Sequence, residues 1–251
     1  LTIVVGTAHG AAYQIAPALL QTLGAQVIAI NSDPTGTNIN ENCGSTCPQQ
    51  LQQAVVEAGA DLGLAFDGDA DRVLAVDEKG RLVDGDQILA ILALDLKERG
   101  LLFGNGVVAT TMSNMGLGLA LKKQGIRLAL AQVGDRYVLE GLRQRGWILG
   151  GEQSGHIINL HYNTTGDGLG TAMQLLNTMV KTGQPLSQLA AVMEPFPQLL
   201  LNVPVARKSG WQDNEAVKIV IEQAQQALQG QGRGLIRPSG NEAVIRGMVA
   251  G

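Results

Sequence analysis

The feature that most constrains the fold of this chain is a repeated alternation of short apolar runs with stretches in which apolar residues have helical spacing. The runs are bounded by turn residues and predict strands at 2–5, 26–30, 61–66, 73–77, 105–110, 126–131, 156–160, 199–205 and 243–249. Helices are expected at 11–23, 48–58, 86–99, 115–124, 136–145, 167–182 and 212–229. Pro17 is expected to kink or end the first helix. Such alternation predicts an α/β fold.

Two interruptions divide the chain into three expected domains. The run GRLVDG stands at 80–85, and two prolines break the pattern at 193–197. We expect two α/β domains with mixed sheets flanked by helices, at 1–82 and 83–195, and a smaller α+β C-terminal domain at 196–251. Because residue 1 is Leu and already lies in an expected strand, we expect a fragment whose last domain is incomplete.

Composition narrows the classes of function. The chain has 251 residues, 45% of them hydrophobic, and a net charge of −4, which gives no basic surface for nucleic acid. Apolar runs stay well below the ~20 residues that span a bilayer, and the N-terminus lacks a basic flank. We therefore expect a cytoplasmic protein without membrane or nucleic-acid partners, and the sequence leaves the oligomeric state open.

The most specific motif is Asp67-Gly68-Asp69-Ala70-Asp71-Arg72, directly after the apolar run 62–66. Carboxylates at alternate positions of a loop can converge on one hard cation, because magnesium and calcium prefer oxygen ligands. Asp67, Asp69 and Asp71 are therefore candidate metal ligands, and Arg72 is a candidate anion contact beside the metal.

Three other interpretations compete for this motif. It can be a solvated acidic turn. It can be an EF-hand loop, although Arg72 stands where that loop needs glycine and the flanks are strand-like. It can also be the Asp-x-Asp of a phosphatase in which the first aspartate is the nucleophile.

Two further loops carry polar side chains on glycine-rich backbone. In GGEQSGH at 150–156, Glu152 and Ser154 can reach the hydroxyls of a polar ligand, and His156 follows them. In RPSGNE at 237–242, followed by Arg246, guanidinium and amide groups can form a phosphate site. Alone, each is also compatible with an ordinary turn.

Taken in order, these three motifs resemble the α-D-phosphohexomutase superfamily. The stretches MSNMG at 112–116, VGDRYV at 133–138, GGEQSGH at 150–156 and TTGDG at 164–168 are most similar to its phosphoglucosamine mutase subfamily. The resemblance covers nearly the whole chain. It implies a four-domain protein of which this chain carries the second, the third and most of the fourth domain.

The resemblance also implies roles for the motif residues. Asp67, Asp69 and Asp71 match the Mg²⁺ ligands, and Arg72 matches the catalytic arginine beside them. Glu152 and Ser154 match residues that hold sugar hydroxyls, with His156 close by. The residues that match the loop for the non-transferred phosphate of a sugar-phosphate substrate are Arg237, Ser239, Gly240, Asn241 and Arg246.

The chain departs from the family in two respects. Members carry a phosphorylated serine in their first domain, and its motif is absent here, so the chain alone is expected not to turn over. Asn241 and Ala243 stand where the family has threonine and proline. A phosphomannomutase or phosphoglucomutase, or a non-catalytic sugar-phosphate-binding remnant, are the alternatives to a phosphoglucosamine mutase.

Overall fold

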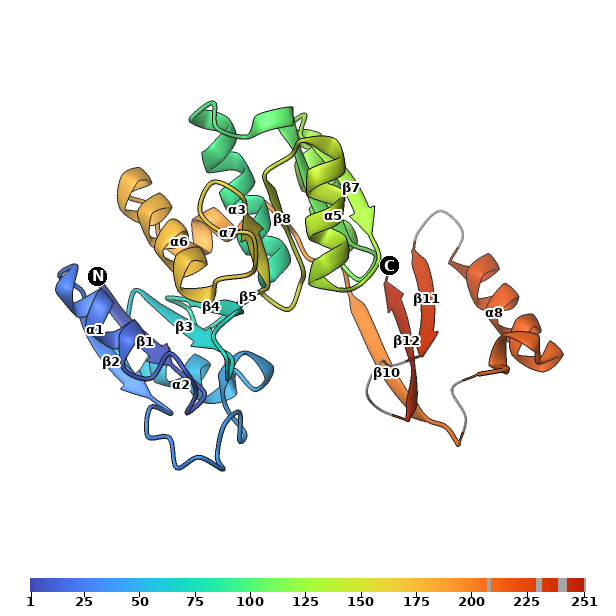
Figure 1. The fold of residues 1–251 in the computed structure, drawn as a ribbon, viewed down its shortest axis with the longest axis horizontal. Coiled ribbons are helices and arrows are strands. Elements are labelled where there is room, and N and C mark those ends of the chain that lie inside the picture. Colours follow the sequence, from blue (N-terminus) through green and yellow to red (C-terminus); the bar gives the residue numbers. More distant parts are fainter. Residues whose placement is uncertain (207–208, 229–231, 239–242, 251) are drawn as a thin grey trace. The chain divides into compact units, whose positions relative to one another are not determined.

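The computed structural model describes residues 1–206, 209–228, 232–238 and 243–250, which form two compact units (Figure 1). Unit 1 contains Leu1–Ser113 and Leu117–Glu194. Unit 2 contains Asn114–Gly116 and Pro195–Gly251. Unit 1 is built around two sheets and unit 2 around one.

The first sheet of unit 1 has the strand order β2-β1-β3-β4-β5. Its strands are β1 (Thr2–Gly6), β2 (Gln26–Ile30), β3 (Leu62–Phe66), β4 (Val73–Asp77) and β5 (Leu82–Val83). The first three run parallel, whereas β4 and β5 are antiparallel to their neighbours. The sheet is therefore mixed, as predicted.

Side-chain alternation along β1 explains how this sheet is covered on both faces. Ile3 and Val5 belong to the largest hydrophobic core, together with Leu20 of α1 (Ile15–Thr22). Val4 points to the other face and packs with Val55 of α2 (Gln49–Ala58). Because successive side chains of a strand alternate in direction, the one strand supports two helical layers.

The second sheet of unit 1 has the order β7-β6-β8-β9. Its strands are β6 (Gly106–Thr110), β7 (Arg127–Ala131), β8 (Leu149–Gly151) and β9 (Ile157–Asn159), the last pairing antiparallel with β8. Val107 and Ala109 face the largest core, and Val108 packs with Leu142 of α5 (Asp135–Arg145) on the opposite face. This sheet is also mixed and covered on both faces.

Helices between the two sheets join them into one unit. α3 (Gly85–Glu98) contacts β4 of the first sheet and β8 of the second, and it also packs on α6 (Gly168–Thr182) and α7 (Leu186–Ala190). The largest core includes residues of both sheets, of these helices and of α4 (Met115–Lys123). The expected boundary at 82/83 falls within β5, shortly before α3 begins, in a part of the chain that belongs to unit 1 on both sides.

In its described residues, unit 2 combines a three-stranded antiparallel sheet with the α-helix α8 (Glu215–Ala227). The strand order is β10-β12-β11, from β10 (Gln198–Pro204), β11 (Arg233–Pro238) and β12 (Val244–Ala250). α8 (Glu215–Ala227) begins after Asn214, whose side chain accepts hydrogen bonds from the N–H groups of Ala216 and Val217. This N-cap satisfies two backbone donors at the helix start.

The predicted fold class is confirmed: two helix-flanked mixed sheets and a smaller α+β unit. The first helix begins at Ile15 rather than at residue 11, so Pro17 lies in its first turn, where a missing N–H breaks no helical hydrogen bond. In the part of the chain that the structure describes, each helix is too short or too polar to span a bilayer.

Candidate functional site

The acidic motif forms the loop between two buried strands. β3 and β4 pair antiparallel with Phe66 opposite Val73, and residues 67–72 connect them. Ligand oxygens of Asp67, Asp69 and Asp71 all lie within 4.8 Å of one another. The predicted convergence of the three carboxylates is therefore found. Since the flanking elements are strands, an EF-hand, in which helices flank the loop, is excluded.

Arg72 partly compensates the charge of this loop. Its Nε lies 3.5 Å from Asp67 Oδ2 and 3.5 Å from Asp71 Oδ1, and its backbone N–H donates to Asp67 Oδ1 at 3.2 Å. Burial raises the pKa of Asp67 to about 6, and the nearby charges of Asp71 and Asp69 add to the rise, although Arg72 opposes it. Three carboxylates facing one guanidinium leave an excess of negative charge.

This donor set fits a hard divalent cation. All three side chains offer carboxylate oxygens. Asp71 Oδ1 is buried and accepts no hydrogen bond from the described residues. Its ion-pair partner Arg72 Nε lies 3.5 Å away, beyond ordinary hydrogen-bond distance, so a second cation beside this oxygen would be stabilising. Asp67, Asp69 and Asp71 are thus the residues that can hold a metal.

Three backbone hydrogen bonds connect the loop and the first residue of β4 to other parts of unit 1. Ala11 N–H donates to Gly68 O at 2.8 Å, Gly168 N–H donates to Ala70 O at 3.0 Å, and Val73 N–H donates to Gly155 O at 3.2 Å. Ala70 has a φ of 63°, a left-handed conformation that is unfavourable for a residue with a Cβ. The surrounding contacts maintain this strained conformation, as is common at functional sites.

The glycine-rich loop lies between β8 and β9. Glu152 is half-buried and its Oε1 accepts a hydrogen bond from Gly134 N–H at 3.0 Å. Ser154 is exposed. Gly155 has a φ of +93°, and a Cβ there would overlap the carbonyl oxygen of Val73. Glycine is required here because the loop passes directly against the start of β4.

His156 connects this loop to the acidic loop. Its side chain is buried, its Nδ1 lies 3.1 Å from Asp71 Oδ2, and its Nε2 accepts a hydrogen bond from Gly166 N–H at 2.9 Å. Sequence reasoning placed His156 beside a sugar and missed the contact with Asp71. Gly134 and Gly166 were also missed as partners, although they lie in the motifs VGDRYV and TTGDG. They act through backbone N–H groups, which have no residue-type signature.

The predicted phosphate site is described only in part. Arg237 in β11 pairs with Arg246 in β12 across the sheet of unit 2, and only the backbone of Arg237 is described. Ser239, Gly240 and Asn241 lie outside the described residues. Their role stays a prediction.

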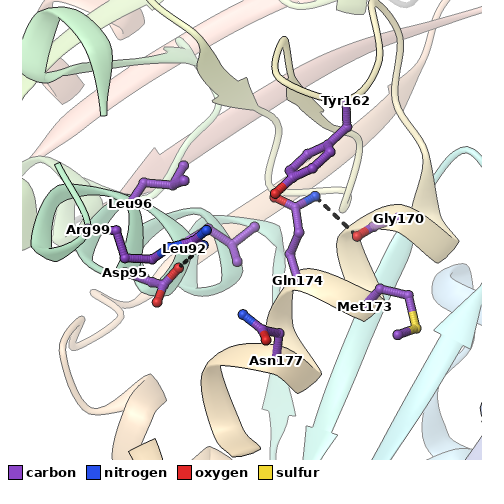
Figure 2. Close-up of a pocket in the computed structure, with 9 residues that line it drawn as sticks. All are labelled: Leu92, Asp95, Leu96, Arg99, Tyr162, Gly170, Met173, Gln174 and Asn177. Atoms are coloured by element: carbon purple, nitrogen blue, oxygen red, sulfur yellow. Dashed lines mark hydrogen bonds and ion pairs between the residues drawn. The ribbon is translucent and has the colours of Figure 1, made fainter. Parts of the chain in front are cut away.

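A separate cavity of about 420 Å³ lies between α3 and α6. Figure 2 shows Asp95 of α3, Arg99 at the C-cap of the same helix, and Gln174 and Asn177 of α6 along this cavity. Asp95 is bound by Arg99 at 2.9 Å and by Lys181 at 3.2 Å. The charge of Asp95 is thus compensated within the protein, and those predicted site residues that the structure describes do not line this cavity.

Family models match the chain in three consecutive segments. They describe domains of phosphoglucomutase/phosphomannomutase: the alpha/beta/alpha domain II at residues 1–80, the alpha/beta/alpha domain III at 84–196 and the C-terminal domain at 200–251. The phosphoglucosamine mutase of Solidesulfovibrio magneticus is 54% identical over 249 residues, which cover 99% of this chain and 55% of that protein. The chain thus spans about half the length of the curated relatives it matches.

Solved structures agree with the fold. A phosphoglucomutase/phosphomannomutase family protein of Burkholderia thailandensis has a TM-score of 0.81 at 22% identity, covering 100% of this chain and 56% of that one. The Aspergillus fumigatus N-acetylphosphoglucosamine mutase, solved in complex with GlcNAc-6P and magnesium, has a TM-score of 0.78 at 21% identity, covering 99% and 62%. The resemblance seen in the motifs is therefore confirmed, and this chain belongs to the phosphoglucomutase/phosphomannomutase family of phosphohexomutases.

Proposed function

We propose that the protein containing this chain is a phosphoglucosamine mutase, which interconverts glucosamine 6-phosphate and glucosamine 1-phosphate in the cytoplasm. The observation that carries the proposal is the convergence of Asp67, Asp69 and Asp71 beside Arg72, in a chain 54% identical to a relative of that name. The remainder of the mechanism, a phosphoserine and a bisphosphate intermediate, follows from the family resemblance.

Magnesium is the proposed metal. Its support is the all-oxygen donor set of the loop and the magnesium in the Aspergillus fumigatus relative. A bound magnesium ion would supply positive charge against the charge that develops on a transferred phosphoryl group. Asp67, Asp69 and Asp71 would hold it, and Arg72 would face the same phosphoryl oxygens with its guanidinium.

The glycine-rich loop is the proposed sugar contact. Glu152 is kept in place by Gly134 N–H, and Ser154 is exposed at the tip of the same turn. A carboxylate and a hydroxyl so placed can orient the hydroxyl groups of a sugar. The loop of Arg237, Ser239, Gly240, Asn241 and Arg246 is proposed to bind the phosphate that is not transferred.

A comparison of substrates tests the proposal. The full-length protein with magnesium is assayed on the 6-phosphates of glucosamine, glucose and mannose. The highest kcat/KM on glucosamine 6-phosphate is expected. A preference for glucose or mannose would assign the protein to the phosphoglucomutase or phosphomannomutase activities instead. Binding without turnover would favour a non-catalytic remnant, and release of phosphate from simple esters by the 251-residue chain would favour a phosphatase.

A substitution in the acidic loop tests the proposed metal site. Asp69→Ala removes an exposed carboxylate, so its effect on folding should be small. We expect mutase activity to fall by at least about 100-fold, because charge stabilisation at the phosphoryl group is lost. Glu57→Ala, at an exposed position near the end of α2, is the matched control and should retain the wild-type rate. If Asp69→Ala keeps most of its rate, the metal assignment is wrong.

A further inference from the structure

Gln153 lies between the two proposed sugar contacts, Glu152 and Ser154, and it is held by the start of α3. Its side-chain amide donates a hydrogen bond to Asp84 Oδ2 at 3.0 Å, across 69 positions of the chain. We propose that Asp84 is a positioning residue that, through Gln153, fixes the backbone from which Glu152 and Ser154 reach the sugar. The inference rests on the proposed function and adds to its sugar site a residue that acts through another side chain.

The backbone of the glycine-rich loop is attached to the same helix. Gly85 N–H donates to Gln153 O at 3.0 Å. Gly85 is the first residue of α3, and a Cβ there would overlap Glu152 O and Gly155 N. The main chain of the loop therefore lies directly against the helix start. Together with the side-chain hydrogen bond, this contact attaches Gln153 to α3 at two points.

Asp84 divides its two carboxylate oxygens between the helix and the loop. Oδ1 accepts the N–H of Gln87 at 3.1 Å, and the side chain of Gln87 accepts the N–H of Asp84 at 3.3 Å, which completes a capping box. Oδ2 accepts the hydrogen bond from Gln153. Because an N-cap needs one acceptor oxygen, the second oxygen of Asp84 is the one that links the helix to the loop.

The helix α3 is a firm support for this link. All residues from Gly85 to Ala93 are buried, and the helix contacts strands of both sheets of unit 1. The loop itself joins two strands of 3 residues each. Within it, Glu152 N–H donates to His156 O and Gly155 N–H donates to Glu152 O. These bonds close the turn without connecting it to the core, so the contacts with α3 contribute to its position.

The link differs in its effect from the hydrogen bond that Gly134 makes. Gly134 N–H orients the carboxylate of Glu152, whereas Asp84 acts on the residue that follows. A displacement of about 1 Å in a group that binds a substrate can cost as much as about 100-fold in rate. Neither Asp84 nor Gln153 belongs to the acidic group that can hold a metal. Loss of the link should therefore weaken sugar binding and leave metal binding unchanged.

A double-mutant cycle tests the link in the full-length protein. Asp84→Ser keeps an N-cap oxygen for Gln87 N–H and removes the oxygen that faces Gln153. Gln153→Met keeps the length of the side chain and removes the donor. The matched control is Gln144→Met, because Gln144 donates to the carboxylate of Glu140 at 3.0 Å on the exposed face of α5. KM and kcat are measured with glucosamine 6-phosphate, and Mn²⁺ binding by electron paramagnetic resonance.

We expect each single variant to raise KM by about 10-fold, with kcat and Mn²⁺ affinity within about 3-fold of wild type. The double variant should have the KM of the single variants, because both changes remove the same link. The control Gln144→Met should match wild type. An unchanged KM in either single variant, effects that multiply in the double variant, or a parallel loss of Mn²⁺ affinity would each overturn the inference.

Glu152→Ala separates the inference from the proposed function. If this variant keeps the wild-type KM, Glu152 does not contact the sugar, and the proposed sugar site is wrong together with the inference. If Glu152→Ala raises KM while Asp84→Ser and Gln153→Met do not, the sugar site is supported and the inference alone fails.

Amide hydrogen exchange of the full-length protein reports the link without any substrate. Peptides that span residues 150–156 should exchange at least about 10-fold faster in Asp84→Ser and in Gln153→Met than in wild type, because the turn is then less firmly attached to α3. This measurement does not depend on which sugar phosphate the enzyme prefers. Equal exchange rates in the variants and in wild type would overturn the inference.

Discussion

Gly168 shows how a single residue determines the position of the acidic loop. It opens α6 and donates its N–H to Ala70 O, and a Cβ at this position would overlap the carbonyl oxygens of Ala70 and Arg72. Gly168→Ala should therefore destabilise unit 1 by about 1–3 kcal/mol, because backbone atoms must move apart. Urea unfolding followed by circular dichroism measures the loss. Mn²⁺ affinity should fall in the same variant.

Gly118 provides the matched control for this glycine substitution. It lies inside α4, where a Cβ would only come within 3.4 Å of a Leu128 side-chain carbon. Gly118→Ala should be neutral or stabilise by up to about 1 kcal/mol, because alanine favours helix more than glycine does. If both variants had the same stability as wild type, the close contact between Gly168 and the acidic loop would not be important for folding.

At the scale of residues, sequence patterns predicted the convergence of side chains in one loop better than the contacts made by backbone N–H groups. Asp67, Asp69 and Asp71 were expected to converge because of their alternate spacing, and they do. The contact of His156 with Asp71 was not expected, since 85 positions separate them and no local pattern links them. The N–H groups of Gly134 and Gly166 could not be predicted, because every residue except proline carries one.

At the scale of elements, the strands rich in apolar residues were predicted with small errors at their ends. β2 and β4 have the predicted bounds. β8 was missed, because two of its three residues are glycines, which are depleted in strands. Gly150 lies in this strand because a Cβ there would overlap Val108 O of the neighbouring strand. β5, β11 and α7 were also missed. β5, with 2 residues, and α7, with 5, are too short to show a hydrophobic period.

The contact between Glu78 and α7 leads to a prediction on pH dependence. Glu78 accepts hydrogen bonds from the N–H and the hydroxyl of Ser187, in the first turn of α7. Although burial opposes it, these hydrogen bonds lower the pKa of Glu78 below its ordinary value of 4.5. Because the pKa of Glu78 is lowered in the folded state, its ionised carboxylate stabilises the fold above pH 4.5. This stabilisation is lost as the pH falls below that value.

Glu78→Gln removes the charge and keeps the shape of the side chain. At neutral pH the variant should be less stable by about 1–2 kcal/mol, since hydrogen bonds to a charged acceptor are lost. Near pH 3 the difference should be smaller, because the stabilisation by the charged Glu78 carboxylate is lost as the pH falls below 4.5. Unfolding by urea at both pH values measures this, with exposed Glu57→Gln as the control. A difference that is the same at both pH values would contradict the role of the carboxylate.

At the scale of the whole molecule, the two units differ in how much apolar surface they bury. The largest core of unit 1 extends over both of its sheets and the helices between them. In unit 2, the buried apolar residues among those described are Met248 and Ala250. In β10, Leu199 is 58% and Leu200 is 47% exposed, although they point to opposite faces of the strand. α8 has no buried residue among those described.

This difference predicts two unfolding transitions for the 251-residue chain. Stability increases with buried apolar area, by about 25 cal/mol per Å². Unit 2 should therefore unfold at a lower urea concentration than unit 1. Amide hydrogen exchange followed by mass spectrometry would show this directly. Peptides from β10 and α8 should exchange early, while peptides from the fully buried strand β3 stay protected until the second transition.

The fluorescence of Trp147 is an independent check of the order in which the two units unfold. Trp147 is buried and belongs to the core around α5 in unit 1, so its fluorescence should respond in the later transition. Trp211→Phe removes the tryptophan of unit 2 from the signal. If exchange in β10 and the fluorescence of Trp147 changed at the same urea concentration, the units would unfold as one. The limited apolar burial in unit 2 would then not determine its stability.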